Sequence, residues 1–328
     1  MTPHDISTLD TDLSEQLPRI VTELPGPRAR ELLAKEEPFL SPSLIHVVPL
    51  MVDRASGCVV RDVDGNTFLD CVAGIATAST GHCHPRVVQA VKDQADVLLH
   101  ICGTDFHYPG YGELASRLAR LAPGPDDWQT FLTNSGTEAV EAAIKLARHH
   151  TGRVDMIAFR GAFHGRSTGS LSLTASKTRY RRGFGPLLPG VHHADYASCH
   201  DCPVGRTYPG CDIACLTESL ERDLFQYTVA PDQVAAIFVE PVQGEGGYVV
   251  PPRDFLVRLR EICDRYGIML VFDEVQSGMG RTGTFFAAEH FGVVPDIITL
   301  AKGLASGFPL GAMMARPEIM TWPGGSHG

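Results

Sequence analysis

The chain has 328 residues, of which 44% are hydrophobic and 20% charged, with 33 Gly and 23 Pro. This composition is ordinary for a globular protein and excludes a collagen-like, coiled-coil or predominantly disordered chain. The 28 Lys and Arg against 38 Asp and Glu give a net charge of −10. Such a surface would repel a nucleic-acid backbone, so no nucleic-acid partner is expected. The length suggests two domains, or one large domain with an appendage.

The first residues of the chain, MTPHDISTLDTDLSEQLPRI, are polar and acidic. They lack the basic and apolar regions of a signal peptide and the arginine-rich character of a transit peptide. No later stretch approaches the ~18 consecutive apolar residues of a membrane span. The sequence therefore predicts a cytoplasmic protein with no membrane partner.

The N-terminal part of the chain is predicted to form an arm, a hairpin and two helices. Residues 1–40 are rich in charge and proline, which favours an extended arm with one short helix. In residues 57–74 the pair Asp64-Gly65 stands between runs rich in Val, Thr and Phe, a strong signal for two antiparallel strands. Residues 86–100 and 111–123 carry apolar side chains at helical spacing and are predicted to be amphipathic helices.

The rest of the chain alternates strand with helix. Short runs rich in Val, Ile and Phe are separated by segments with helical periodicity, which is the pattern of βαβ units. Such units form a mostly parallel sheet covered by helices on both faces, so the predicted fold class is α/β. Ligands of these sheets bind beyond the carboxyl ends of the strands. The predicted strands are residues 129–134, 155–163, 234–242, 267–275 and 295–303, and the predicted helices are residues 137–152 and 253–267.

A candidate anion site stands between the strand 129–134 and the helix that follows it. Ser135 with Glu138 three residues later is a capping box, and the free N–H groups and dipole of the helix favour an anion. Gly136, between the hydroxyl residues Ser135 and Thr137, lets a phosphate approach the backbone closely. An ordinary helix cap without a ligand is the alternative.

A second group of polar residues ends the strand 267–275. Asp273, Glu274 and Gln276 follow wholly apolar residues. A buried unpaired carboxylate costs more than the ~2–7 kcal/mol of an unsatisfied polar group, so a cation must meet it. Lys302 ends the next predicted strand, 29 residues after Asp273, or about one βα unit away. In one sheet the two side chains would emerge at the same edge with room for a small ring between them, or they would form a simple salt bridge.

Together these groups match what pyridoxal phosphate requires, namely a helix N-terminus for its phosphate, a carboxylate for its pyridine nitrogen and a lysine for a Schiff base. From about residue 40 onward the chain resembles the class III aminotransferases, a subgroup of the fold-type I pyridoxal-phosphate enzymes. This family includes 4-aminobutyrate, ornithine, acetylornithine and diaminobutyrate transaminases. The blocks that carry the resemblance, in the family's order, are NSGTEAVEAAIKLAR, AFHGR, VEPVQGEGG, VFDEVQSGMGRTG and LAKGLASGFPLGA.

The resemblance assigns roles to the residues that would bind the cofactor. It implies that Lys302 binds pyridoxal 5'-phosphate covalently and later moves the proton, and that Asp273 pairs with the pyridinium nitrogen. Gln276 would hydrogen-bond near the phenolic oxygen of the ring. Phe163 would stack on one face of the cofactor and Val275 would press on the other. The phosphate would be held by Ser135, Gly136 and Thr137.

Two further residues are implied in substrate recognition. The planar guanidinium of Arg166 suits bidentate binding of a carboxylate, and its family counterpart is associated with the carboxylate of the 2-oxo acid. Glu240 resembles the glutamate that gates a second arginine, so that one pocket accepts both an ω-amine and an α-amino dicarboxylate. His164 is expected to have a packing or supporting role, because Lys302 already supplies the base.

The resemblance also implies a domain organisation and an assembly. Residues 1–75 would be the N-terminal arm and the hairpin segment of the small domain, and residues 76–328 the cofactor-binding large domain. Relatives continue beyond the block in which this chain stops. The C-terminal small domain is therefore expected to be absent, and the isolated chain to lack a complete active site. The segment Gly74–Gly112 is expected to lie at the interface of a homodimer and to reach the cofactor of the neighbouring subunit.

Four of the nine cysteines cluster in an insertion rich in Gly and Pro. Cys199, Cys202, Cys211 and Cys215 have a spacing compatible with a tetrahedral zinc or iron–sulfur site, although it is not a standard finger pattern. Two disulfides, which are rare in reducing compartments, or four plain thiols are the alternatives, and no metal is assigned. The other five cysteines lie in apolar or mixed segments and are expected to be buried, reduced thiols.

The function expected from this resemblance is transfer of an amino group from an ω-amino donor, in the first place 4-aminobutyrate, to 2-oxoglutarate. The partners would be small molecules, an amine donor and a 2-oxo acid. Ornithine, acetylornithine and diaminobutyrate transaminases and an amino-acid epimerase of the same family are the alternatives among enzymes. A fragment that binds the cofactor but turns over no substrate is the alternative from another class.

Overall fold

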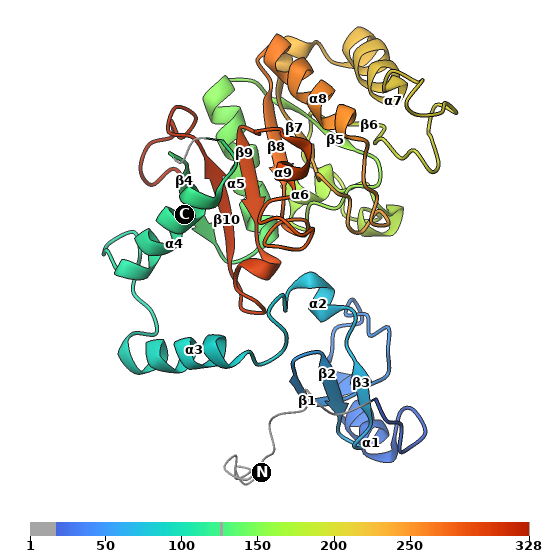
Figure 1. Ribbon diagram of the computed structural model, residues 1–328, viewed down its shortest axis with the longest axis vertical. Helices are drawn as coiled ribbons and strands as arrows, with labels where there is room; N and C mark the ends of the chain where they lie inside the picture. Colours follow the sequence, from blue (N-terminus) through green and yellow to red (C-terminus); the bar gives the residue numbers. More distant parts are fainter. Residues whose placement is uncertain (1–17, 125–126, 328) are drawn as a thin grey trace. The chain divides into compact units, whose positions relative to one another are not determined.

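The computed structural model describes residues 18–124 and 127–327. The chain folds into two compact units, Met1–Ile101 and Cys102–Gly328, each with its own sheet (Figure 1). All the candidate site residues named above belong to the second unit. The domain boundary expected at residues 75 and 76 rests on the family resemblance and stays a prediction.

The first unit is built on a three-stranded antiparallel sheet in the order β1-β2-β3. Strands β2 and β3 pair on either side of the Asp64-Gly65 turn, so the predicted hairpin is confirmed. Asp64 also accepts hydrogen bonds from the backbone amides of Arg28 (2.9 Å) and Ala29 (2.8 Å) and so caps helix α1. The elements of this unit are α1 (Pro27–Glu36), η2 (Glu37–Phe39), β1 (Val52–Ser56), β2 (Val59–Asp62), β3 (Thr67–Leu69), α2 (Ala73–Ala76) and α3 (Pro85–Val97).

The second unit contains a seven-stranded sheet in the order β4-β10-β9-β8-β7-β5-β6. Neighbouring strands are parallel except at β10, which is antiparallel to both β4 and β9. The predicted mostly parallel α/β sheet is therefore confirmed, whereas β6 and β10 are strands that the sequence did not predict. The strands are β4 (Gln129–Thr133), β5 (Asp155–Phe159), β6 (Val191–Ala194), β7 (Val234–Val239), β8 (Met269–Asp273), β9 (Ile297–Leu300) and β10 (Gly311–Ala315).

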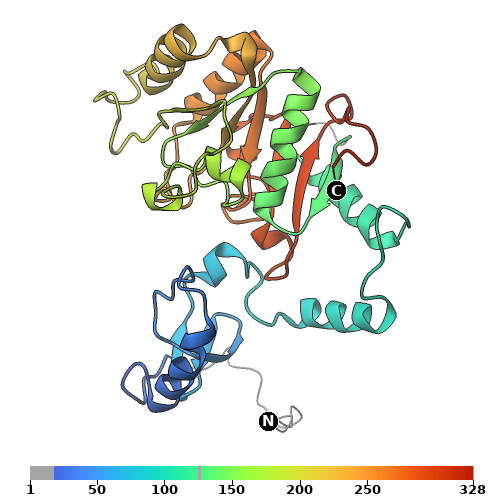
Figure 2. The same ribbon diagram turned by 180° about the vertical axis from the view of Figure 1, so that it is seen from behind.

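Helices cover both faces of this sheet. Helix α5 lies on one face and helices α4, α8 and α9 lie on the other, as the opposite views in Figures 1 and 2 show. None of the helices in the described part of the chain is long and apolar enough to cross a membrane. The helices of this unit are α4 (Pro109–Leu121), α5 (Gly136–Thr151), α6 (Thr168–Leu173), η3 (Thr178–Tyr180), α7 (Ala214–Leu216), η4 (Thr217–Thr228), η5 (Pro231–Gln233), α8 (Arg253–Tyr266), α9 (Ala288–Phe291) and η6 (Lys302–Leu304).

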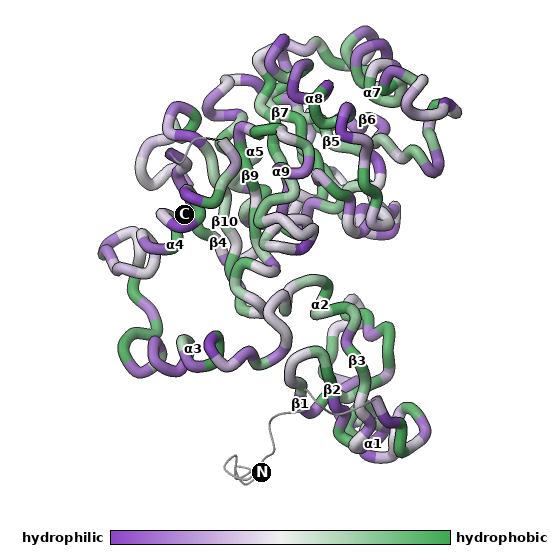
Figure 3. The backbone as a smooth tube through the Cα atoms, in the orientation of Figure 1, coloured by the Kyte–Doolittle hydropathy of each residue, from purple (hydrophilic) through white to green (hydrophobic). Residues whose placement is uncertain are grey.

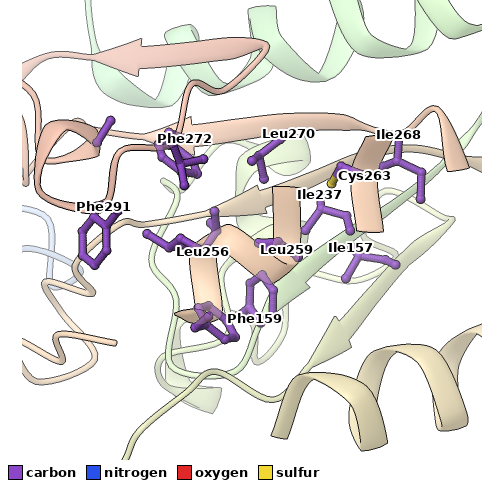
Figure 4. Packing of buried hydrophobic residues seen from close by; sticks show 14 of the residues in the cluster. Ile157, Phe159, Ile237, Leu256, Leu259, Cys263, Ile268, Leu270, Phe272 and Phe291 are labelled. Atoms are coloured by element: carbon purple, nitrogen blue, oxygen red, sulfur yellow. The ribbon is translucent and has the colours of Figure 1, made fainter. Parts of the chain in front are cut away.

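Two clusters of buried apolar side chains, one on each face, hold the sheet between its helices. Because side chains alternate along a strand, Ile157 and Phe159 of β5 join the cluster on the α8 side, while Met156 and Ala158 join the cluster on the α5 side. Figure 4 shows the first cluster around Leu259 of α8. Strands β5, β7, β8 and β9 are hydrophobic over most of their length (Figure 3), which is why they were predictable from the sequence.

The exposure of the scattered cysteines differs from the expectation. Cys263 of α8 is buried, as expected. Cys58, Cys71, Cys83 and Cys102 are exposed, so the expectation is wrong for these four. They stand in turns and loops between the helices and strands, and such connecting segments run over the surface.

Candidate functional site

The candidate residues gather at one edge of the seven-stranded sheet. Strands β4, β5, β7, β8 and β9 run in the same direction, so their carboxyl ends meet at this edge. Each of the five strands leads directly into residues that the sequence analysis singled out. These are Ser135, Gly136 and Thr137 after β4, Phe163, His164 and Arg166 after β5, Glu240 after β7, Asp273, Val275 and Gln276 at the end of β8, and Lys302 after β9.

The first turn of helix α5 packs closely against Val275, which follows β8. Ser135 is the N-cap, and its hydroxyl accepts a hydrogen bond from the amide of Glu138 at 3.3 Å. The carboxylate of Glu138 accepts from the amide of Asn134 at 2.7 Å, so the predicted capping box reaches one residue beyond the cap. Gly136 has no room for a side chain, because a Cβ there would lie 2.9 Å from Cγ1 of Val275. The turn can therefore approach Val275 this closely only because residue 136 is glycine.

The hydroxyl of Thr137 belongs to a small polar cluster. Its Oγ1 lies 2.7 Å from Oγ of Ser167 and 2.6 Å from Oγ of Ser170. Ser167 also donates a hydrogen bond to Glu141 of α5 at 2.6 Å. The cluster ties helix α6 to the first turns of α5 and fixes the hydroxyl beside the open amides.

Lys302 has an unusual backbone conformation directly after β9. Its φ of +44° lies in the left-handed region, which costs a non-glycine residue roughly 1–3 kcal/mol. Its ammonium group donates a hydrogen bond to Oε1 of Gln276. Burial lowers the pKa of Lys302, and Arg281 lowers it further, while Asp273 and Glu240 counteract part of this effect. Strain and a lowered pKa at one half-buried lysine are typical of a functional position.

Asp273 is held by His164 and not by Lys302. The Nδ1–H group of His164 donates to Oδ2 of Asp273 at 2.7 Å, and the amide of Val275 donates to Oδ1 at 3.0 Å. Burial alone would lower the pKa of the His164 imidazole, but the hydrogen bond and the charge of Asp273 raise it overall. Among the residues that the structure describes, no ion pair joins Asp273 to Lys302, so the simple salt bridge is excluded there.

Phe163 and Arg166 lie against Tyr180, a residue that sequence reasoning missed. The ring centroids of Phe163 and Tyr180 are 5.7 Å apart, and the two planes are nearly perpendicular at 79°. The guanidinium carbon of Arg166 lies 4.6 Å from the centroid of Tyr180 and 5.9 Å from that of Phe163. Arg166 is therefore stacked on aromatic rings directly beside the edge at which the other candidate residues meet.

Glu240 joins two of the loops at this edge. It is buried, and its two carboxyl oxygens accept hydrogen bonds from the amides of Phe163 and Gly244, each at 2.9 Å. Burial raises the pKa of Glu240 to about 7, with a contribution from Asp273, although His164 and the two amides oppose the shift. The loop after β5 is thereby fixed to the loop after β7. The gating role that the resemblance implies for Glu240 stays a prediction.

The raised pKa of Glu240 gives a pH-dependent stability that can be measured. An acid whose pKa rises from 4.5 to about 7 on folding stabilises the protein below pH 4.5 and loses this contribution as the pH rises to about 7. In the variant Glu240→Gln the side chain does not ionise, so the stability of this variant does not fall in this way as the pH rises. Its free energy of unfolding relative to the wild type should therefore increase by about 1.4 kcal/mol per pH unit across this range.

Urea denaturation at several pH values checks this prediction. Glu261→Gln, which removes an exposed carboxylate of α8, is the matched control and should show a difference from the wild type that does not vary with pH in this way. A pH-independent difference for Glu240→Gln would show that Glu240 does not bind its proton more tightly in the folded chain.

The sequence-based expectation was also wrong about which groups contact the carboxylate of Glu274. The expected cation, Lys302, does not pair with Asp273, which contacts His164 instead, and the carboxylate of Glu274 is buried among neutral donors. It accepts hydrogen bonds from the amides of Ala287 (2.9 Å) and Ala288 (2.8 Å) and from the hydroxyl of Ser277 (3.1 Å). Glu274 therefore anchors the loop that follows β8. The sequence indicates only that a buried carboxylate needs hydrogen-bond donors. It does not indicate whether those donors are backbone amides or cations.

The four clustered cysteines are free thiols in this structure. In the described part of the chain, no group of three or more His, Cys, Asp and Glu side chains is arranged to hold a metal ion. Burial raises the pKa of Cys215 to about 12, and the charges of the other three thiols add to the shift. Burial and the charges of Cys211 and Cys202 likewise raise the pKa of Cys199. These two thiols are therefore protonated at neutral pH.

Comparison with known proteins identifies the family. Residues 42–328 match the family Aminotransferase class-III, and the chain belongs to it, so the resemblance inferred from the sequence is confirmed. The chain is 43% identical over 301 residues to the 4-aminobutyrate aminotransferase of Escherichia coli K12, covering 91% of this chain and 68% of that protein. It is 40% identical over 319 residues to the alanine/serine racemase of Pyrococcus horikoshii, covering 95% of this chain and 66% of that protein.

A solved structure supports the same assignment. The taurine:2-oxoglutarate aminotransferase of Bifidobacterium kashiwanohense, in complex with PLP and glutamate, matches with a TM-score of 0.80 at 29% identity. The match covers 92% of this chain and 66% of that one. The chain spans about two thirds of the length of the curated relatives it matches.

Proposed function

We propose that this chain is the cofactor-binding part of a pyridoxal-phosphate-dependent aminotransferase. It would move an amino group from an ω-amino donor, in the first place 4-aminobutyrate, to 2-oxoglutarate. One observation carries the proposal. Lys302, half-buried, strained and with a lowered pKa, stands at the same sheet edge as Asp273 and the first turn of α5. These are the three kinds of group that pyridoxal phosphate requires of a protein.

The residues present fit this cofactor. The first turn of α5 offers free amides beside two hydroxyl groups, and Gly136 adds no side chain there, a combination that suits a phosphate. Asp273 uses one lone pair on each oxygen for His164 and Val275, so it retains acceptors for a protonated ring nitrogen. Gln276 already lies within hydrogen-bond distance of Lys302. Stacking of the ring between Phe163 and Val275 is part of the same proposal.

When bound, pyridoxal phosphate supplies a carbonyl carbon that forms a Schiff base with amines and a ring that spreads negative charge. In this chain Nζ of Lys302 would be the amine that bonds to that carbon, because a lowered pKa increases its neutral, nucleophilic fraction. The same Nζ, when free, would take the proton from the reacting carbon and return it. Asp273 would hold a proton on the ring nitrogen, and the buried imidazole of His164 orients the Asp273 carboxylate.

Substrate recognition is assigned to Arg166 within this proposal. A guanidinium binds a carboxylate through two parallel hydrogen bonds, which fixes the orientation of the substrate as well as its position. The donor and acceptor proposed here both carry a carboxylate. The printed names of the relatives, a 4-aminobutyrate aminotransferase and a taurine:2-oxoglutarate aminotransferase, support these two substrates.

A half-reaction tests the proposed activity without an acceptor. The purified chain is loaded with pyridoxal phosphate and mixed with 4-aminobutyrate, and the small molecules are separated by chromatography. We expect the cofactor to become pyridoxamine phosphate while an equal amount of succinic semialdehyde forms. Addition of 2-oxoglutarate should restore pyridoxal phosphate and yield glutamate. Cofactor that stays unchanged with every ω-amine would contradict the proposal and favour the alternative of a fragment that binds the cofactor but turns over no substrate. Racemisation of L-alanine without net conversion of the cofactor would favour the epimerase alternative.

We also propose that the chain forms a homodimer through the segment Gly74–Gly112. Helix α3, which lies in this segment, has apolar residues at helical spacing but contributes no buried residue. Val97 is 82% exposed, Leu99 86% and Phe106 58%. A helix of 13 residues with no packed face is marginally stable by itself, and an obligate interface of roughly 2,000 Å² or more would cover it. This assembly and the cytoplasmic location are both predictions.

Sedimentation at several protein concentrations tests the assembly. The wild type should sediment as a dimer, and Val97→Glu combined with Leu99→Glu should shift it to a monomer, because two carboxylates would be buried in the interface. Lys35→Glu, at an exposed position of α1 outside the segment, is the control and should leave the dimer intact. A compact wild-type monomer that stays soluble at high concentration would count against the proposed interface.

A further inference from the structure

We infer that Tyr180, held by Glu245, is a positioning residue for Arg166 and sets the preference of this site for substrates with a carboxylate remote from the reacting carbon. The inference deepens the proposed function and rests on it. Arg166 is the residue that would touch the substrate. Tyr180, Glu245 and Lys177 act on Arg166 through contact and charge.

Stacking alone holds the guanidinium of Arg166. It lies 4.6 Å from the ring centroid of Tyr180 and 5.9 Å from that of Phe163. Within residues 18–124 and 127–327, no hydrogen bond or ion pair engages its N–H groups. A cation–π contact fixes the plane of a guanidinium without using its donors. The donors of Arg166 therefore remain available to an incoming carboxylate.

The ring of Tyr180 is itself fixed at several points. Its hydroxyl donates a hydrogen bond to Oε1 of Glu245 at 3.0 Å. Arg179 donates to the same hydroxyl at 3.2 Å, and its guanidinium carbon lies 5.1 Å from the ring centroid. Phe163 packs against the ring at nearly a right angle. A ring anchored at its hydroxyl and packed by a neighbouring ring offers Arg166 a defined surface on which to stack.

Glu245 is the carboxylate that contacts Tyr180, the ring on which Arg166 stacks, and it is paired with a cation. Its Oε1 forms an ion pair with Nζ of Lys177. Burial would raise the pKa of Glu245, but hydrogen bonds from Lys177, Ser176 and Tyr180 and the charge of Lys177 lower it overall. The carboxylate is therefore ionised at neutral pH and paired with Lys177. Its Oε2 is buried and has no hydrogen-bond partner among the described residues, so the charge of Lys177 is what offsets the attraction of this carboxylate for Arg166.

The charges around Tyr180 indicate which substrates Arg166 would bind best. Among the described residues, the cations Arg166, Lys177 and Arg179 lie over or beside the ring, and Glu245 is the one carboxylate that contacts it. This excess of positive charge, with one unpaired planar guanidinium, attracts a carboxylate and gives no advantage to an amine that lacks one. The substrate class is therefore ω-amino acids and dicarboxylic 2-oxo acids rather than simple amines.

Binding of glutarate, a dicarboxylate that cannot react, tests the inference by calorimetry on the purified chain, with and without pyridoxal phosphate. Tyr180→Leu should weaken binding about tenfold because the stacking surface is lost, and Tyr180→Phe should weaken it less. Lys177→Met should also weaken binding about tenfold, because Glu245 is then free to pair with Arg166. Adding Glu245→Gln to Lys177→Met should restore binding to within about twofold of the wild type.

Arg182→Ala, at an exposed arginine of the same segment, is the matched control and should leave glutarate binding unchanged. Unchanged binding in Tyr180→Leu and Lys177→Met, or no recovery in the double variant, would overturn the inference. A wild-type chain that does not bind glutarate would overturn it as well. If the variants change glutarate binding as expected but no amine ever converts the cofactor, the proposed activity is wrong while the positioning role of Tyr180 is supported.

Discussion

Replacing Lys302 with alanine should abolish the absorption band of the lysine–cofactor linkage, while the chain still binds pyridoxal phosphate non-covalently. The proposed phosphate site at the first turn of α5 and the carboxylate of Asp273 are untouched by the substitution. Only the amine that bonds to the cofactor is lost, so amino-group transfer should fall to the background level. Absorption spectra and equilibrium dialysis measure the two effects separately.

Lys145→Ala is the matched control for this prediction. Lys145 lies on α5, and its Nζ contacts the ring of His327 at 2.7 Å, away from the strand ends that carry the site. Its loss should leave the absorption band unchanged. An unchanged band in Lys302→Ala would remove Lys302 from its proposed role.

The second large effect is expected for Asp273→Asn. An amide can still accept the hydrogen bond from His164, but it carries no charge to keep a proton on the ring nitrogen. The rate of amino-group transfer should therefore fall about 100- to 1,000-fold, the range for losing one preorganised electrostatic partner in an active site. Retention of the cofactor should change far less, because the proposed phosphate site remains.

Asp296→Asn controls for the stability cost of losing a buried carboxylate. Asp296 precedes β9, at the opposite edge of the sheet, and pairs with Arg260 at 2.7 Å. Its replacement should lower the free energy of unfolding but not the rate per folded molecule. Near wild-type rates in Asp273→Asn would exclude Asp273 from the mechanism.

The strands that carry the site were predictable because they are buried on both faces. Parallel strands covered by helices are continuously apolar, so a polar residue at their carboxyl end stands out, as Asp273 and Lys302 do. Strands β6 and β10 were missed for the opposite reason. Strand β6 reads VHHA, with a single β-branched residue, and β10 reads GAMMA, with none, so neither has the run of β-branched or aromatic residues that marks a strand.

The contacts within the site depend on long-range packing that no local pattern contains. His164 and Asp273 are 109 positions apart, and Tyr180 and Glu245 are 65 apart. The sequence placed His164 in a supporting role but gave no reason to pair it with that carboxylate. Tyr180 was not predictable at all, since an aromatic residue in a connecting segment has no distinctive spacing. Residue types at strand ends were therefore predictable, whereas their mutual contacts required the fold.

The most direct test of the central claim is borohydride reduction of the cofactor-loaded chain, followed by proteolysis and peptide mapping. Reduction makes the bond between cofactor and lysine permanent and so records which amine formed it. The label should be found on the peptide that contains Lys302, and the variant Lys302→Ala should carry none. A label on Lys145 or Lys177, or no label on a chain that holds the cofactor, would contradict the assignment of the site.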